Sequence, residues 1–316
     1  MVGGATTAAA PFPRLVRVAP VFSFGLVSAA GMSRFGFPTA PDRLLLWLGG
    51  GLLCSSLLDT QRIRRLFLEW LPFVAVLFAY DFVRGFADGT RASAHTLPQV
   101  WTAKLVGDGS IPAVWLQQHL WHGAGHLKWY DYATWAVYAS HFVVTPVLAA
   151  ALWIRSAPLF RRFAAMVVVL ALTGLATYAL FPAMPPWLAS EDHLIPHTTR
   201  LMDPIASHIP LVDLRPLFEA GERYSNDVAA IPSLHAAYAL LAALFLARCT
   251  RRRSLRIALA LYPLAMGFAL VYGAEHYTLD VLLGWLYAVA AYVSVDRVLS
   301  RRSAARWNAG GVEQPA

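Results

Sequence analysis

The sequence has few charged residues, few cysteines and no compact basic-then-apolar leader at its start. Of its 316 residues, only 14% are charged and 58% are hydrophobic. A soluble protein rarely has so few charges, so the composition predicts an integral membrane protein. Cys54 lies in an apolar run and Cys249 beside a basic cluster, which excludes a disulfide framework. The first residues show no clear cleavage site, so we expect no cleavable signal peptide.

Long apolar runs divide the chain into candidate membrane helices, each close to the roughly 20 residues that a bilayer core requires. The clearest runs are 66–84, 133–154, 163–181, 232–248, 256–273 and 278–298. Upstream, 43–58 is a further expected span, and 18–33 either spans the membrane or lies in its interface. The sequence therefore predicts an all-α integral membrane protein with a six-helix core in residues 66–300. One or two extra helices are expected within 1–65, and 301–316 is expected to be a disordered cytoplasmic tail.

Clusters of arginine between these runs predict the orientation of the chain. They lie within 62–65, 155–162, 248–256 and 297–306, which fall on one side if the six strong spans alternate. Positive charge in short loops marks the cytoplasmic side, so the net charge of +8 orients helices rather than binding nucleic acid. Two long segments, 85–132 and 182–231, then face outward. There we expect short helices that lie over the membrane surface.

Two short motifs near the carboxyl end carry most of the predicted chemistry. The first reads Ile-Pro-Ser-Leu-His over 231–235, and the second reads His-Tyr-Thr-Leu-Asp over 276–280. The apolar hairpin between them returns the second histidine to the membrane face of the first. Proline in a first helical turn is favourable, and a helix start binds phosphate through its free N–H groups. Ser233 can add a hydroxyl donor there.

His235, His276 and Asp280 form the predicted catalytic group. His276 and Asp280 are four residues apart, so on a helix they share one face. The carboxylate can then fix the tautomer of the imidazole and leave its other nitrogen as the nucleophile. A single histidine near a helix end is more often an interfacial polar residue. Ionisable residues inside a membrane are costly and tend to be functional, however, and here three converge.

The two motifs resemble those of the type-2 phosphatidic acid phosphatase superfamily. Its usual motif has glycine where this chain has Leu234, and Pro-Ser-Leu-His is instead similar to the fungal inositol phosphorylceramide synthase branch. The string from His276 to Val281 is similar to the matching motif of sphingomyelin synthases. Residues 226–231 and 181–187 are similar to bacterial members of the inositol phosphorylceramide synthase-like branch. The resemblance covers residues 66–298.

This resemblance implies a six-helix core and a phosphohistidine mechanism that needs no metal or other cofactor. His276 would attack phosphorus, Asp280 would orient it, and His235 would protonate the leaving alkoxide. Water or an alcohol, such as inositol or a sugar lipid, would then attack the phosphohistidine. The implied substrate is a lipid phosphate or phosphodiester at the outer face of a membrane. The high alanine and arginine content suggests a GC-rich bacterial genome, so we expect a multi-pass protein of the bacterial inner membrane, surrounded by membrane lipids.

The chain departs from the phosphatase pattern at its phosphate-binding cations. The Ser-Arg pair before the nucleophilic histidine is Ala269-Leu270 here, and a Lys-x6-Arg-Pro motif is missing. A buried phosphate still needs a compensating charge. Arg84, at the outer end of 66–84, is the first candidate, although it can instead pair with Asp81 in its own helix.

Further residues are weaker candidates for contacting the substrate. His141 either lines the site or bonds to a neighbouring helix, and Tyr277 is expected to contact substrate. Three arginines of the second long segment are expected mainly at the surface, with a headgroup contact as the minority alternative: Arg200, Arg215 and Arg223.

Two other functions compete with lipid phosphoryl transfer. In the first, His235, His276 and Asp280, with His141 as a fourth candidate, bind zinc in a membrane hydrolase. In the second, the histidines belong to a transporter or proton-coupled carrier. The sequence shows no inverted repeat or broken helix pair, which disfavours the transporter.

Overall fold

The computed structural model describes residues 14–35, 41–57, 59–86, 94–209 and 226–310 of the chain. Within these residues the secondary structure is helical, apart from isolated parallel β-bridges that join His95 to Ala183 and Ala183 to Ala229. The predicted all-α fold is therefore confirmed.

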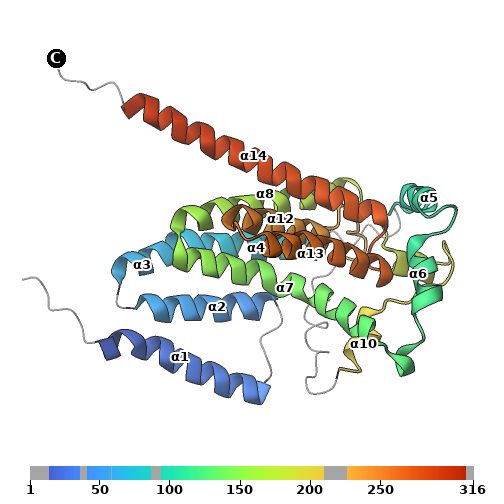
Figure 1. Cartoon of the computed structure of the whole chain (residues 1–316), viewed down its shortest axis with the longest axis horizontal. Helices are drawn as coiled ribbons and strands as arrows, with labels where there is room; N and C mark the ends of the chain where they lie inside the picture. Colours follow the sequence, from blue (N-terminus) through green and yellow to red (C-terminus); the bar gives the residue numbers. More distant parts are fainter. Residues whose placement is uncertain (1–13, 36–40, 58, 87–93, 210–225, 311–316) are drawn as a thin grey trace, which may run out of the picture.

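The body of the molecule is a bundle of long helices that run along its longest axis (Figure 1). They are α4 (Leu71–Phe86), α7 (Trp129–Arg155), α8 (Ala157–Leu180), α12 (Leu234–Cys249), α13 (Arg253–Tyr272) and α14 (Thr278–Gly310). On one flank, α2 (Pro41–Ser56) packs against α7, and α1 (Arg14–Phe35) packs against α2. A short helix α3 (Thr60–Arg65) and a π-helical turn η1 (Leu66–Trp70) lead into α4.

Several of these helices have the length and composition of membrane spans. Four are long and apolar enough to cross a bilayer: α7, α8, α13 and the part of α14 from Thr278 to Arg301. The segment Arg43–Ser56 and α12 are also apolar but shorter. These helices show that the chain is an all-α membrane protein, as the composition predicts.

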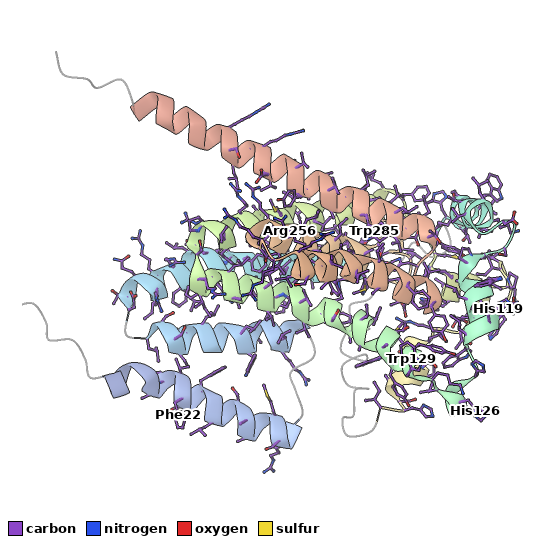
Figure 2. The ribbon with its side chains drawn as sticks, in the orientation of Figure 1. Phe22, His119, His126, Trp129, Arg256 and Trp285 are labelled. Carbon is purple, nitrogen blue, oxygen red and sulfur yellow. The ribbon has the colours of Figure 1, made fainter. Side chains whose placement is uncertain are left out.

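Short helices gather at one end of the bundle, which we call the loop end (Figure 1). They include α5 (Leu97–Val106), α6 (Pro112–Leu120), the 3-10 turn η3 (Ala124–His126), α9 (Pro186–Glu191) and α10 (Met202–Ala206). Figure 2 labels His119, His126 and Trp129 at this end. The short helices expected in the two long segments are therefore present in their described parts.

The arginine clusters meet at the opposite end, which we call the arginine end. Arg162 and Arg248 both contact Oδ1 of Asp296, at 2.9 and 2.7 Å. Arg161 contacts Glu69 at 3.5 Å. Because these pairs join clusters that are far apart in the sequence, the clusters lie on one side of the bundle, as alternating spans require.

Several helix boundaries differ from the sequence expectation. α8 begins at Ala157 rather than near 163, because a helix can carry Arg161 and Arg162 beyond the apolar region that defines a span. α14 runs to Gly310, so residues 301–310 are helical where a disordered tail was expected. Alanine and arginine, frequent in that segment, have high helix propensity. Residues 311–316 lie outside the described part.

Two glycines allow close packing around the start of α12. A methyl group at Gly174 of α8 would lie 2.9 Å from Cδ2 of Leu234. A methyl group at Gly284 of α14 would overlap the carbonyl oxygen of Ser233. Glycine therefore brings α8 and α14 against the turn that precedes His235.

Candidate active site

The first histidine is placed by the N-terminal cap of α12. Ser233 is the cap residue, with φ −67° and ψ 106°, and its Oγ accepts a bond of 3.3 Å from the N–H of Ala236. The helix thus begins at Leu234, and Pro232 lies before it rather than in its first turn as expected, because Ser233 has extended backbone angles. The hydroxyl of Tyr178 donates to the Pro232 carbonyl at 2.8 Å. His235 consequently lies in the first turn of a firmly held helix.

The second histidine is placed by the turn between α13 and α14. The N–H groups of Glu275 and His276 both donate to the carbonyl of Leu270, at 3.0 and 3.2 Å. Ala274 in this turn has a left-handed φ of 58°. α14 begins only at Thr278, so His276 and Asp280 do not share a helical face, contrary to expectation. The peptide geometry of the turn, not helical spacing, sets their approach.

Asp280 joins the two histidine segments. Its Oδ2 accepts a bond of 2.8 Å from the N–H of Tyr277, which caps α14. Its main-chain oxygen accepts a bond of 2.9 Å from the N–H of Ser233. One residue therefore ties the start of α14 to the start of α12 and fixes the relative position of His235 and His276.

The ring of His276 has two acceptors near one nitrogen. Its Nδ1 lies 3.1 Å from the carbonyl oxygen of Ala230 and 3.5 Å from Oδ2 of Asp280. Both groups accept hydrogen bonds, so we assign the proton of the neutral ring to Nδ1. Nε2 then carries the lone pair. The side chain of Asp280 is fully buried and that of His276 is nearly so.

Three histidines from different elements converge at this point. The ring centroids of His235 and His276 are 5.7 Å apart, and those of His141 and His235 are 4.1 Å apart. Tyr138, one turn before His141 on α7, stacks on His235 at 5.1 Å. The structure therefore brings together the predicted group of His235, His276 and Asp280 and adds His141 to it.

Other predicted substrate-binding residues have different surroundings. The ring of Tyr277 is buried in an apolar cluster with Met266 and Val281, and burial raises the pKa of its hydroxyl. That hydroxyl has no hydrogen-bond partner among the described residues. Arg84 belongs to α4, but its side chain lies outside the described residues, as do Arg215 and Arg223.

Gln99 is a buried polar residue that the sequence interpretation missed. It lies on α5 with no exposed surface, and its Nε2 donates to the carbonyl of Met184 at 3.3 Å. The same amide is a near neighbour of the carboxylate of Asp280. Neither Oδ1 of Asp280 nor Oε1 of Gln99 has a hydrogen-bond partner within the described parts of the chain. The sequence signal for this residue was a polar glutamine within an apolar run.

A second missed feature is an ion pair directly beside His276. Nε of Arg200 lies 3.0 Å from Oε1 of Glu275, and the guanidinium lies 4.9 Å from the ring centroid of Trp187. Glu275 raises the pKa of Arg200 above its usual value. Arg200 was expected mainly at the surface, but only 24% of its side chain is exposed.

Gln117 of α6 fixes the loop segment that carries Arg200. Nε2 of Gln117 donates to the carbonyls of Thr199 and Tyr272, at 2.8 and 2.9 Å. Its Oε1 accepts a bond of 2.8 Å from the N–H of Thr199. One buried amide therefore links α6, the segment before Arg200 and the end of α13.

The alternative zinc site has no support from the geometry. Within the described ranges, no group of three or more His, Cys, Asp or Glu side chains could hold a metal ion. The named candidates His235, His276, Asp280 and His141 are close together but do not form such a group.

Comparisons with known proteins agree with these features. The model of a family described as the PAP2 superfamily matches residues 113–294, more than half of the chain. A phosphoinositol dihydroceramide synthase from Bacteroides thetaiotaomicron is 31% identical over 133 residues. That match covers 40% of this chain and 42% of the relative, so the chain spans less than half of its length. No solved structure shows significant similarity to the chain.

Proposed function

The chain belongs to the PAP2 superfamily, and on this premise we propose that it transfers a phosphoryl group from a lipid phosphate or phosphodiester. The group passes through a covalent phosphohistidine on His276. The supporting observation is the approach of the His235 and His276 rings to 5.7 Å, with the Asp280 carboxylate behind Nδ1 of His276. These are the groups that a double displacement at phosphorus requires.

In the first step, Nε2 of His276 attacks phosphorus while the bond from phosphorus to the leaving oxygen breaks. His235, as the imidazolium, donates its proton to the leaving alkoxide. The ring of His276 gains positive charge in this step, which the Asp280 carboxylate stabilises. The lipid alcohol leaves, and the phosphoryl group, with any headgroup it carries, stays on His276.

In the second step, an acceptor hydroxyl attacks the phosphohistidine. His235 is now neutral and takes the hydroxyl proton, which restores the starting protonation state. An alcohol acceptor, such as inositol or a sugar lipid, gives a transferase, and water gives a lipid phosphatase. The similarity to the Bacteroides synthase favours an alcohol.

We place the reaction at the extracytoplasmic face of a bacterial inner membrane. The arginine clusters lie at the end of the bundle opposite the histidines, and basic loops remain on the cytoplasmic side. Lipid headgroups would then reach the histidines from the outer leaflet.

Incubation of the purified protein with labelled lipid phosphates and phosphodiesters, with and without inositol, tests this function. Transfer gives a new labelled phosphodiester, whereas hydrolysis gives free phosphate or a free phosphorylated headgroup. We expect His276→Ala to remove both products. A fully active His276→Ala protein would refute the nucleophile, and uptake of substrate into liposomes without turnover would favour a transporter.

A further inference from the structure

The pair formed by Arg200 and Glu275 lies at the loop end, beside the predicted nucleophile. Nε of Arg200 is 3.0 Å from the Glu275 carboxylate, and that carboxylate is only 8% exposed. Asp203 is a weaker neighbour, with an oxygen 3.9 Å from Nη1 of Arg200 and nearly half of its side chain exposed. A buried ion pair costs desolvation energy and is a poor source of stability. Stability alone therefore does not explain why a buried ion pair lies beside His276, which favours a functional role.

Arg200 is close to the segments that carry both histidines. Its partner Glu275 immediately precedes His276, and both N–H groups bond to the same carbonyl. On the other side, the guanidinium lies over Trp187, which packs against the same apolar cluster as Tyr138. Tyr138 in turn stacks on His235 at 5.1 Å. The guanidinium is thus linked to the nucleophile through Glu275 and to the general acid through Trp187 and Tyr138.

The proposed reaction needs a cation near the two histidines. A lipid phosphodiester carries one negative charge and a phosphomonoester up to two, and a buried anion without a partner is costly. In the described loop-end segments, 94–132, 182–209 and 226–231, Arg200 is the one arginine. The lysines of those segments, Lys104 and Lys128, are exposed.

We propose that Arg200 binds the phosphate of the substrate and that Glu275 holds its guanidinium in position. This inference rests on the proposed function and names the cation of that site. The bond of 3.0 Å from Nε to Glu275 orients the guanidinium. Arginine binds phosphate oxygens in pairs, and stacking on Trp187 further restricts its plane. The loop thereby supplies the charge that the Ala269-Leu270 positions lack.

Inorganic phosphate provides a probe that does not depend on knowing the lipid. In the wild-type protein in detergent, we expect phosphate to raise the midpoint of thermal unfolding and to inhibit turnover competitively. Arg200→Gln should weaken phosphate binding at least tenfold and raise KM more than it lowers kcat. Arg200→Lys keeps the charge without the paired donors, so it should recover part of the affinity.

Arg248→Gln is a matched control, because Arg248 pairs with Asp296 at 2.7 Å at the arginine end. It removes an arginine–carboxylate pair far from the histidines and should leave phosphate binding unchanged. Equal weakening by both variants would contradict a specific role for Arg200.

The double variant Arg200→Gln/Glu275→Gln separates binding from stability. Arg200→Gln alone leaves the Glu275 carboxylate buried without its partner, which destabilises the fold. The second substitution removes that charge, so the unfolding temperature should recover while phosphate binding stays weak. Recovery of phosphate affinity in the double variant would show a purely structural pair and overturn the inference.

Failure of this inference differs from failure of the proposed function. Wild-type phosphate affinity in Arg200→Gln, together with an inactive His276→Ala protein, would reject Arg200 and keep the phosphohistidine. Absence of any phosphate effect on the wild-type protein would also count against the site.

Discussion

Replacing Gly284 with alanine tests whether the site depends on close contact between α14 and the start of α12. The added methyl group would overlap the carbonyl oxygen of Ser233 and lie 3.2 Å from its carbonyl carbon. Both atoms belong to the backbone, so no side-chain rotation can relieve the overlap. The two segments must move apart.

The two segments must separate by on the order of 1 Å to bring the methyl group into ordinary van der Waals contact. This movement disturbs the hydrogen bond that joins the two catalytic segments. The N–H of Ser233 donates to the Asp280 carbonyl at 2.9 Å, and His235 follows two residues later. A misplacement of about 1 Å in a reacting group costs about 100-fold in rate. Overpacking costs about 1–3 kcal/mol, which is less than the stability of most domains. We therefore expect Gly284→Ala to fold and to lose about 100-fold in kcat/KM.

Gly174→Ala is the control for this experiment. Its methyl group would lie 2.9, 3.0 and 3.2 Å from Cδ2, Cδ1 and Cγ of Leu234, which are side-chain atoms and not backbone. Activity on the best lipid of the panel and the midpoint of thermal unfolding are measured for both variants. We expect Gly174→Ala to remain within about threefold of wild-type activity. A folded Gly284→Ala protein with wild-type kcat/KM would refute the reasoning, and so would an equal loss in both variants.

Three further substitutions address single interactions. Asp280→Asn removes the charge behind His276, so kcat should fall by about 10²–10³-fold, and acid-quenched protein should hold less phosphohistidine; unchanged kcat would contradict this role. Gln99→Leu removes the buried amide near Asp280, and we expect kcat to fall about tenfold without a change in KM, as steady-state kinetics would show. The hydroxyl of Tyr272 donates to the buried Asp131 at 2.6 Å. Tyr272→Phe removes this donor, so the free energy of unfolding should fall by about 1–3 kcal/mol. Retained activity with a lower unfolding midpoint would fit that stabilising role.

The long helices were predictable because a bilayer constrains their composition and length. α7 and α13 follow directly from apolar runs bounded by arginine or aromatic residues. The start of α8 was placed too late because hydropathy detects the apolar part of a helix and not its polar extension. The expected disorder of residues 301–310 was wrong for a similar reason, since these residues extend α14. A charged, alanine-rich sequence can be helical without being apolar.

The two histidine motifs identified the centre of the site, but the residues around it depend on contacts between distant segments. Gln99 reaches Asp280 from α5, and Arg200 reaches Glu275 from the second long segment. The bond from Tyr178 to the Pro232 carbonyl likewise crosses from α8 to α12. A sequence shows such polar residues without their partners, so a buried arginine and a surface arginine look alike.

The two acceptors of Nδ1 in His276 determine what the Asp280→Asn experiment can measure. If Asp280 alone fixed the tautomer, asparagine would permit the proton to move to Nε2 and remove the nucleophile. Here the carbonyl oxygen of Ala230 is the closer acceptor, at 3.1 Å against 3.5 Å. The carbonyl should keep the proton on Nδ1 in the variant, so the remaining loss reflects the missing charge beside the ring as it becomes cationic. For that reason we expect an intermediate loss in Asp280→Asn, whereas a loss as complete as that of His276→Ala would show that Ala230 does not hold the tautomer.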